Sequence, residues 1–333
     1  MIETTTATQL PHPGGPAGEP EAAEPRKRIK ELEVMVADVV VETPDAATLV
    51  LFTGNDRLWY EPGHFLTIDP HQFEALERFI DYFEDVKGRR EPPRAYSLAS
   101  APHERYLAIT VKEERYQRGV TKYPPLLSPL LVKRTTRGMR LRVVGFTGPY
   151  VLPRGVEDRT DHVVHLVAGS GAVPNFSILK HALRCHPRLR HTFVYSNKTW
   201  RDVIFREPLA ELAREHPDRL RVVHALTRER ARVGAVRAGA EDPASSARRG
   251  RAGEGTGHPE VRYGRVGADL LRELVPDPAS CLVYACGPGV GPWEKLAARE
   301  RGEAPRPRFL EAVMDALGEV GVPRDRIKRE SYG

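Results

Sequence analysis

The first half of the chain alternates short runs of β-branched and apolar residues with turn-forming residues. These runs lie at residues 34–41, 48–52, 64–68, 107–111 and 139–144. Short strands separated by frequent turn signals are typical of antiparallel barrels and sandwiches. The pattern therefore predicts an antiparallel β-barrel or sandwich over residues 31–155.

One segment of this half has a helical pattern instead. Apolar residues recur there with the 3.6-residue spacing of an amphipathic helix, at Phe73, Leu76, Phe79, Ile80 and Phe83. The spacing predicts a helical insertion over residues 72–86, between two strands.

The second half has a different rhythm, in which apolar runs alternate with helical patterns. The runs lie at residues 162–168, 191–196, 220–225, 280–285 and 327–330, and the helical patterns at 174–184, 208–216, 267–274 and 309–320. Strands that alternate with helices indicate a parallel sheet with helices on both faces. We therefore expect an α/β domain over residues 160–333.

Two segments lack any apolar period. Residues 1–30 mix Thr, Pro, Gly, Ala and Glu without the layout of a secretory signal, and residues 234–260 are rich in Gly, Ala, Arg and Ser. Such compositions do not supply a packed core. We expect a disordered tail at 1–30, a mobile loop at 234–260 and a cytoplasmic protein.

Composition narrows the chemistry further. The 333 residues include three cysteines, Cys185, Cys281 and Cys286, which are too few for a disulfide framework or a four-cysteine iron–sulfur cluster within this chain. Twelve histidines have no persuasive metal-ligand spacing, so we expect no metal site. The net charge of +6 suits an acidic partner or a phosphorylated ligand without requiring nucleic acid.

A strand that runs into a glycine pair and then a helix is the first candidate binding motif. In residues 165–176, Gly169 and Gly171 allow a sharp turn and close approach of the backbone to a ligand, and Pro174 favours the first helical turn. The helix start then presents amide groups to a pyrophosphate. A tight strand-to-helix turn without a ligand is the alternative, because the third glycine of the common dinucleotide fingerprint is absent.

The end of the next strand carries hydroxyl and cationic side chains. An acid here is typical of NAD sites, whereas a 2′-phosphate requires hydroxyl and cationic donors. Ser196, Lys198 and Arg201 therefore favour NADPH over NADH, with a solvated polar loop as the alternative.

Short motifs in a fixed order give a family resemblance. They are Arg94-Ala-Tyr96-Ser97, then Gly119-Val-Thr121, then residues 148–152 (GPYVL), then the loop with Gly169 and Gly171, then Cys286-Gly287-Pro288. Taken alone, residues 94–100 would be an ordinary strand. Together the motifs resemble the ferredoxin–NADP reductase-like flavoproteins, and among these the reductase components of bacterial aromatic-ring and steroid oxygenases.

The resemblance implies an FAD-binding barrel followed by an NAD(P)-binding domain, with FMN a less favoured flavin. Arg94 would pair with the flavin phosphates, Tyr96 would pack along the isoalloxazine and Ser97 would hydrogen-bond flavin N5. Gly119 and Thr121 would lie against the pyrophosphate, although the family normally has two glycines at this point.

The later motifs would complete the site of hydride transfer. The resemblance implies that Cys286, followed by Gly287 and Pro288, lies beside the nicotinamide. Glu330 would help to organise the site near Ser97, and Tyr332 would cover the flavin or nicotinamide. The bland alternatives are a small buried cysteine at a strand end and a frayed terminus.

The expected function is an FAD-dependent NAD(P)H oxidoreductase that passes electrons to a separate ferredoxin-like iron–sulfur protein, plausibly for an oxygenase. A free-flavin or quinone reductase and a nitric-oxide or siderophore-type reductase differ only in the acceptor. A non-catalytic electron-transfer flavoprotein subunit is the alternative from another class, and Gly169, Gly171 and Cys286 argue against it.

Overall fold

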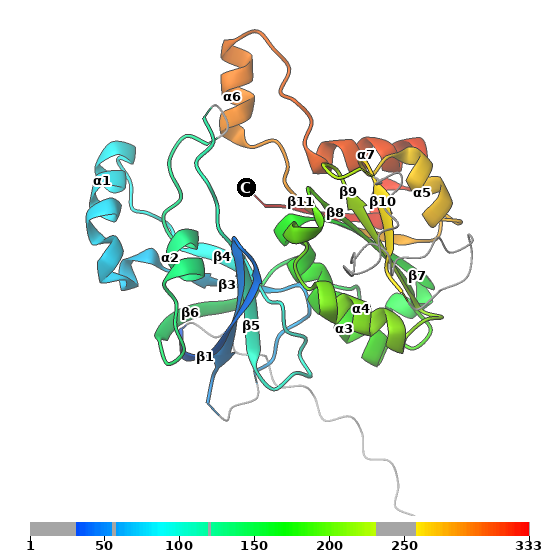
Figure 1. The fold of residues 1–333 in the computed structure, drawn as a ribbon, viewed down its shortest axis with the longest axis horizontal. Coiled ribbons are helices and arrows are strands. Elements are labelled where there is room, and N and C mark those ends of the chain that lie inside the picture. Colours follow the sequence, from blue (N-terminus) through cyan, green and yellow to red (C-terminus); the bar gives the residue numbers. More distant parts are fainter. Residues whose placement is uncertain (1–30, 55–57, 119–120, 231–257, 333) are drawn as a thin grey trace, which may run out of the picture.

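The computed structural model describes residues 31–54, 58–118, 121–230 and 258–332. The expected tail at 1–30 and most of the expected loop at 234–260 lie outside this part. Two six-stranded sheets lie side by side (Figure 1). The first half of the chain forms the antiparallel sheet and the second half the parallel sheet, which confirms the predicted fold class.

The antiparallel sheet has the strand order β4-β3-β6-β1-β2-β5. An isolated bridge between Leu98 and Ile109 links the chain just after β4 to β5 and brings the two edges together, as in a barrel. The strands are β1 (Leu32–Thr43), β2 (Ala46–Phe52), β3 (Phe65–Ile68), β4 (Arg94–Ser97), β5 (Leu107–Lys112) and β6 (Arg140–Thr147).

Alternating burial explains why these segments are strands. Along β6, Leu141 and Val143 are buried while Arg140, Arg142 and Val144 are exposed. One face of β6 thus reaches the core and the other reaches solvent. The barrel core also contains the short helix α2 (Ser128–Lys133) through Leu131, an element that the sequence did not predict.

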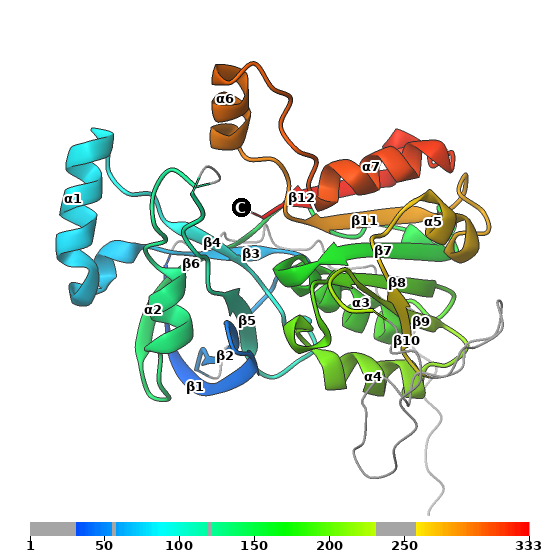
Figure 2. The same cartoon turned by 45° about the horizontal axis from the view of Figure 1, so that its top comes forward.

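The predicted insertion is present, with one error in its buried face. Two 3₁₀ turns (Pro70–Gln72 and Glu74–Leu76) precede helix α1 (Glu77–Lys87), which projects from the barrel (Figure 2). Ile80 and Phe83 face the core, but Phe79 is 61% exposed. The assignment of Phe79 to the apolar face is wrong: Ile80 and Phe83, three residues apart, share the inner face, and Phe79 lies about 100° around the helix from Ile80.

The parallel sheet has the strand order β10-β9-β8-β7-β11-β12. Every neighbouring pair in it is parallel. Its strands are β7 (His162–Ala168), β8 (Arg190–Asn197), β9 (Leu220–Leu226), β10 (Glu260–Tyr263), β11 (Leu282–Gly287) and β12 (Ile327–Ser331).

Helices cover both faces of this sheet, as predicted. Helices α3 (Ala172–Cys185) and α4 (Arg206–Glu215) share one hydrophobic cluster with the sheet, and α5 (Ala268–Leu274) and α7 (Phe309–Glu319) share another. Helix α6 (Pro292–Glu300) stands away from both sheets in Figures 1 and 2. The sequence predicted neither α6 nor β10. The expected loop at 234–260 extended too far at its C-terminal end, since the buried Glu260 begins β10.

Polar contacts join helix α3 to the barrel. The Ser177 hydroxyl donates to the Ser100 carbonyl at 2.6 Å, and the Lys180 ammonium lies 2.5 Å from the Glu104 carboxylate. At Gly63, which has a φ of +96°, an added Cβ would lie 2.0 Å from the carbonyl oxygen of Tyr150. Glycine is therefore required where the barrel meets the connection into the second domain.

We expect Gly63→Ala to lower the free energy of unfolding by at least about 2 kcal/mol, because the methyl group adds a clash to a left-handed backbone. Gly138→Ala is the matched control: its φ is +88° but no atom lies within 4 Å of the added Cβ. That variant should lose only about 1 kcal/mol. Urea denaturation of both variants measures the difference, and equal losses would contradict the packing argument.

Candidate active site

The two sheets meet where β4 ends and the C-terminal strand ends. Ser97, the last residue of β4, is buried, and its hydroxyl forms a hydrogen bond with the phenol of Tyr332, which follows β12. These residues are 235 positions apart in sequence. The contact joins the barrel directly to the parallel sheet.

The register of the parallel strands brings two further predicted residues to this place. Cys286 of β11 pairs with Glu330 of β12, and the amide of Tyr332 donates to the Gly287 carbonyl at 3.1 Å. The side chain of Tyr332 also interacts with the Cys286 thiol. Ser97, Cys286, Glu330 and Tyr332 therefore converge, as the sequence analysis expected of a redox site.

Burial raises the pKa values of the acidic groups in this site. Burial raises the pKa of the Cys286 thiol well above its ordinary value, and the nearby Glu330 carboxylate raises it further. Burial alone raises the pKa of Glu330 to about 7. Its Oε2 atom is buried and has no hydrogen-bond partner within the described ranges. An unpartnered carboxyl oxygen in such a place is a polar group available to a ligand.

The glycine loop after β7 (Gly169–Gly171) packs against the backbone of Cys286. Gly169 has a φ of +54°, and its carbonyl accepts a 2.8 Å hydrogen bond from the Tyr195 hydroxyl. An added Cβ at Gly171 would lie 2.2 Å from the Cys286 carbonyl oxygen, so only glycine allows this approach. Pro174 is buried in the first turn of α3, where its missing amide hydrogen is tolerated.

The residues after Cys286 connect the site to α7. Gly287 is close to the aromatic ring of Phe309, since an added Cβ would lie 2.7 Å from its Cδ1 atom. The Pro288 carbonyl accepts a 3.2 Å hydrogen bond from the Leu310 amide. Gly287 and Pro288 thus fix the strand end that carries Cys286 against the start of a helix.

Arg94 is held by a glutamate that sequence reasoning missed. Its guanidinium donates to the Glu91 carboxylate at 2.6 Å and to the Pro92 carbonyl at 2.8 Å. Glu91 is only 1% exposed and also pairs with Lys87 of α1. The only signal in the sequence was an acid three residues before Arg94. Tyr96, two residues after Arg94 on the same strand face, is half-buried.

The second expected phosphate contact has a local structure of its own. The Thr121 hydroxyl donates to the Gln117 carbonyl at 3.2 Å and accepts from the Gln117 amide at 2.9 Å. Thr121 therefore closes a turn. Gly119, expected beside it, lies outside the described residues.

The polar residues at the end of β8 lie apart from this cluster, because β7 separates β8 from β11. Ser196 is buried at the end of the strand, whereas Lys198 and Arg201 are exposed. Their place at the carboxyl edge of the sheet is where dinucleotides bind in open α/β folds.

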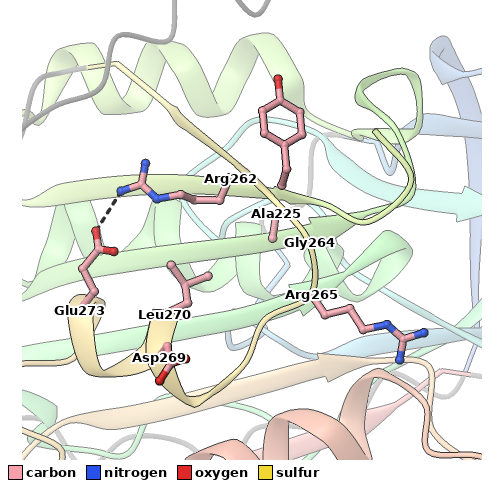
Figure 3. Close-up of a pocket in the computed structure, with 8 residues that line it drawn as sticks. Ala225, Arg262, Gly264, Arg265, Asp269, Leu270 and Glu273 are labelled. Atoms are coloured by element: carbon pink, nitrogen blue, oxygen red, sulfur yellow. Dashed lines mark hydrogen bonds and ion pairs between the residues drawn. The ribbon is translucent and has the colours of Figure 1, made fainter. Parts of the chain in front are cut away.

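A cavity lies at the edge of the parallel sheet, at the end of β10 (Figure 3). Its volume is about 250 Å³. Arg262 on its wall pairs with the carboxylates of Glu260 and Glu273, both at 2.9 Å, and Arg265 points away from Arg262. Because Arg262 is already compensated and three strands separate β10 from β11, this cavity is not part of the cluster around Cys286.

The described part of the chain has neither a membrane-spanning helix nor a cluster of metal ligands. None of its helices is long and apolar enough to cross a membrane. Within the same ranges, no group of three or more His, Cys, Asp or Glu side chains is arranged to hold a metal ion.

Comparison with known proteins identifies the fold. Residues 166–239 match the model of the oxidoreductase NAD-binding domain. The ferredoxin reductase component of 3-ketosteroid-9-alpha-monooxygenase from Mycobacterium tuberculosis is 30% identical over 90% of this chain and 65% of its own length. The corresponding component from Mycolicibacterium smegmatis is 36% identical over 59% of this chain and 50% of its own length.

Solved structures agree with the sequence relatives. The FAD/NAD-binding domain of nitric oxide dioxygenase from Vibrio cholerae matches with a TM-score of 0.61 and 21% identity, covering 92% of this chain and all of that domain. A ferredoxin reductase of carbazole 1,9a-dioxygenase has a TM-score of 0.58 and 19% identity, covering 93% of this chain and 71% of its own. The chain has a ferredoxin–NADP reductase-like fold. The resemblance inferred from the motifs is thereby confirmed, and this reductase-like chain spans 65% of the length of its Mycobacterium tuberculosis relative.

The raised pKa of Glu330 predicts how the stability of this reductase-like chain depends on pH. An acid whose pKa rises on folding, here from 4.5 to about 7, stabilises the fold below pH 4.5 and loses that contribution as the pH rises to 7. Glu330→Gln, which stays neutral, should therefore be more stable than wild type at pH 8, by on the order of 2 kcal/mol. The two proteins should differ little at pH 4.5.

Urea denaturation at both pH values measures this difference. A stability difference between the two proteins that is the same at pH 4.5 and pH 8 would show that the pKa of Glu330 does not rise on folding.

Proposed function

We propose that the chain is an FAD-dependent NAD(P)H reductase that passes electrons to a ferredoxin-like iron–sulfur protein. The observation that carries this proposal is the convergence of Ser97, Cys286, Glu330 and Tyr332 between the two sheets. They come from three separate segments, since Glu330 and Tyr332 share the C-terminal one. A structural core would not need four such polar groups at one interface. The relatives named as ferredoxin reductase components of a monooxygenase support the same activity.

The barrel side of the site fits a flavin. Arg94 uses two of its five N–H donors on Glu91 and Pro92, so donors remain for phosphate oxygens. Tyr96 offers a half-buried aromatic surface on the same face of β4. Among the residues that the structure describes, the Ser97 hydroxyl bonds only to Tyr332, and it can redirect this hydrogen bond to a ligand. Thr121 would support the pyrophosphate, together with Gly119.

The parallel sheet fits a pyridine nucleotide. Gly169 has open space where a Cβ would be, and the closely packed Gly171 is the N-cap residue of α3. The start of α3, which includes Pro174, suits the pyrophosphate. Exposed Lys198 and Arg201, together with Ser196, supply the donors that favour NADPH. Gly287 and Pro288 would border the nicotinamide beside Cys286.

Four residues of the chain would then prepare the reaction. A bound flavin supplies the conversion of a two-electron hydride into single electrons. Ser97 would hold its reacting edge, and the Tyr332 side chain would exclude water until the nucleotide enters. Glu330, with a pKa of about 7, can hold or release a proton at its carboxyl oxygen near neutral pH. The thiol of Cys286 stays neutral and presents a small, polarisable surface.

An acidic iron–sulfur protein suits the charge of this chain. The net charge is +6, which increases the rate of encounter with an acidic partner, more strongly at low salt. Oxygenase systems need such a carrier, and the Mycobacterium tuberculosis relative is named as the ferredoxin reductase component of one.

An anaerobic visible spectrum tests the proposal. Purified protein, reconstituted with FAD, should show flavin absorbance that bleaches on addition of stoichiometric NADPH, and more slowly with NADH. FMN in place of FAD is the matched control for the cofactor. Protein that binds neither flavin, or whose bound flavin stays oxidised with both nucleotides, would overturn the proposed function.

Two substitutions should separate flavin binding from flavin reduction. Arg94→Ala removes a charge-assisted contact, so the Kd for FAD should rise about 10- to 100-fold. Ser97→Ala should leave the FAD content near wild type while flavin reduction slows about tenfold, because only the contact to the reacting edge is lost. Fluorescence titration and stopped-flow absorbance measure the two quantities. Equal effects of both substitutions on both quantities would show that the roles are wrongly assigned.

A further inference from the structure

A chain of buried polar side chains lies behind the glycine loop. Asn175 in the first turn of α3 is fully buried, and its amide nitrogen donates to the Gly171 carbonyl at 3.2 Å and to the Tyr150 hydroxyl at 3.0 Å. Its Oδ1 atom is 2.8 Å from Nδ1 of His165 on β7. Nε2 of His165 is in turn 3.2 Å from Nδ1 of His191 on β8.

The hydrogen bonds of this chain have one consistent direction. Because both amide hydrogens of Asn175 are donated, its oxygen must accept a hydrogen bond from the Nδ1–H group of His165. Neutral His165 can then accept at Nε2 from Nδ1 of His191. Burial lowers the pKa of His165 to about 4 and that of His191 well below its ordinary value, so both rings are neutral near pH 7. Each side chain therefore fixes the orientation of the next.

Asn175 contacts one residue beside Cys286 and one residue beside the barrel. One is Gly171, whose Cα packs beneath the Cys286 carbonyl. The other is Tyr150, which belongs to the connection from the barrel and whose own carbonyl oxygen packs on Gly63. A shift of the Asn175 amide would move the start of α3 relative to that connection, and with it the loop beneath Cys286.

We propose that Asn175 is a positioning residue for hydride delivery, which locks the glycine loop to the barrel connection through Gly171 and Tyr150. The inference rests on the proposed function and adds to it a residue to which the motif at 165–176 assigned no role. A fully buried amide is expensive to desolvate, whereas an apolar side chain of similar size would fill this space more cheaply. The amide instead supplies geometry, because its three hydrogen bonds permit a single arrangement.

Asn175→Leu in the FAD-loaded protein is the main test, because leucine has a similar volume and removes all three hydrogen bonds. Flavin reduction by NADPH in stopped-flow measurements should slow about tenfold or more, which corresponds to the loss of one well-placed hydrogen bond. The FAD content and the rate of photochemical reduction, which needs no nucleotide, should stay near wild type. A purely structural role would not separate these two routes of reduction.

Thr192→Val is the matched control. The Thr192 hydroxyl is buried in the same sheet and hydrogen-bonds His162 at 2.9 Å, but it touches neither the glycine loop nor Tyr150. Its loss should lower thermal stability without slowing reduction by NADPH.

A pair of substitutions at His165 keeps the test decisive if Asn175→Leu does not fold. In His165→Asn the amide nitrogen lies near the position of Nδ1 and can still donate to Asn175. In His165→Gln the amide lies near the position of Nε2 and cannot. His165→Asn should therefore be reduced by NADPH faster than His165→Gln.

The outcomes distinguish this inference from the proposed function. Asn175→Leu protein that is reduced by NADPH at the wild-type rate would overturn the positioning role, as would equal slowing of photochemical reduction. Equal rates for the two His165 variants would also overturn it. Wild-type protein that binds no FAD, or that neither nucleotide reduces, would overturn the proposed function itself, and the positioning role with it.

Discussion

The hydrogen bond between Ser97 and Tyr332 is the constraint on which the arrangement of the site depends. It forms only if the last strand of the chain lies in the parallel sheet at the edge that faces the barrel. Pairing of β12 with β11 achieves this, and it also sets Glu330 opposite Cys286. Parallel pairing of distant segments is entropically demanding and requires both faces of the sheet to be covered. The helices on the two faces are therefore as necessary to the proposed site as the residues in it.

The same burial that assembles the site decides its charges. Cys286 is fully buried among Tyr150, Ile178 and Tyr284, so its thiol is held neutral. A carboxyl group in such surroundings is poised near pH 7 instead of near 4.5, as Glu330 is. Arg94 lies in the opposite environment: it is partly exposed and keeps its charge beside the buried carboxylate of Glu91. The chain thus separates a charged region suited to phosphates from a neutral region suited to a transferred hydride.

Hydrophobic periodicity predicted most of the strands because most of them are buried on one or both faces. Residues 162–168 were predicted as a strand and form β7, which is buried along its whole length. Periodicity did not predict α6 and β10, which bury few apolar side chains. Helix α6 stands away from the sheets, and β10 is a four-residue edge strand whose Glu260 pairs with Arg221. The motifs singled out Ser97, Cys286, Glu330 and Tyr332, which the folded chain brings together. Glu91 and Asn175 make their contacts only in the folded chain, so no spacing indicated them.

The two polar residues that sequence reasoning missed have a common logic. Glu91 orients Arg94 and Asn175 orients Gly171, and both are almost fully buried behind the groups they hold. Burying such groups is unfavourable unless every hydrogen bond is made, so their native partners leave little freedom of orientation. Apolar packing alone tolerates small shifts, because it has no preferred direction. The proposed reaction depends on the distance between two bound cofactors and would benefit from directional supports, so hydrogen-bonded groups at these two positions fit the proposed function.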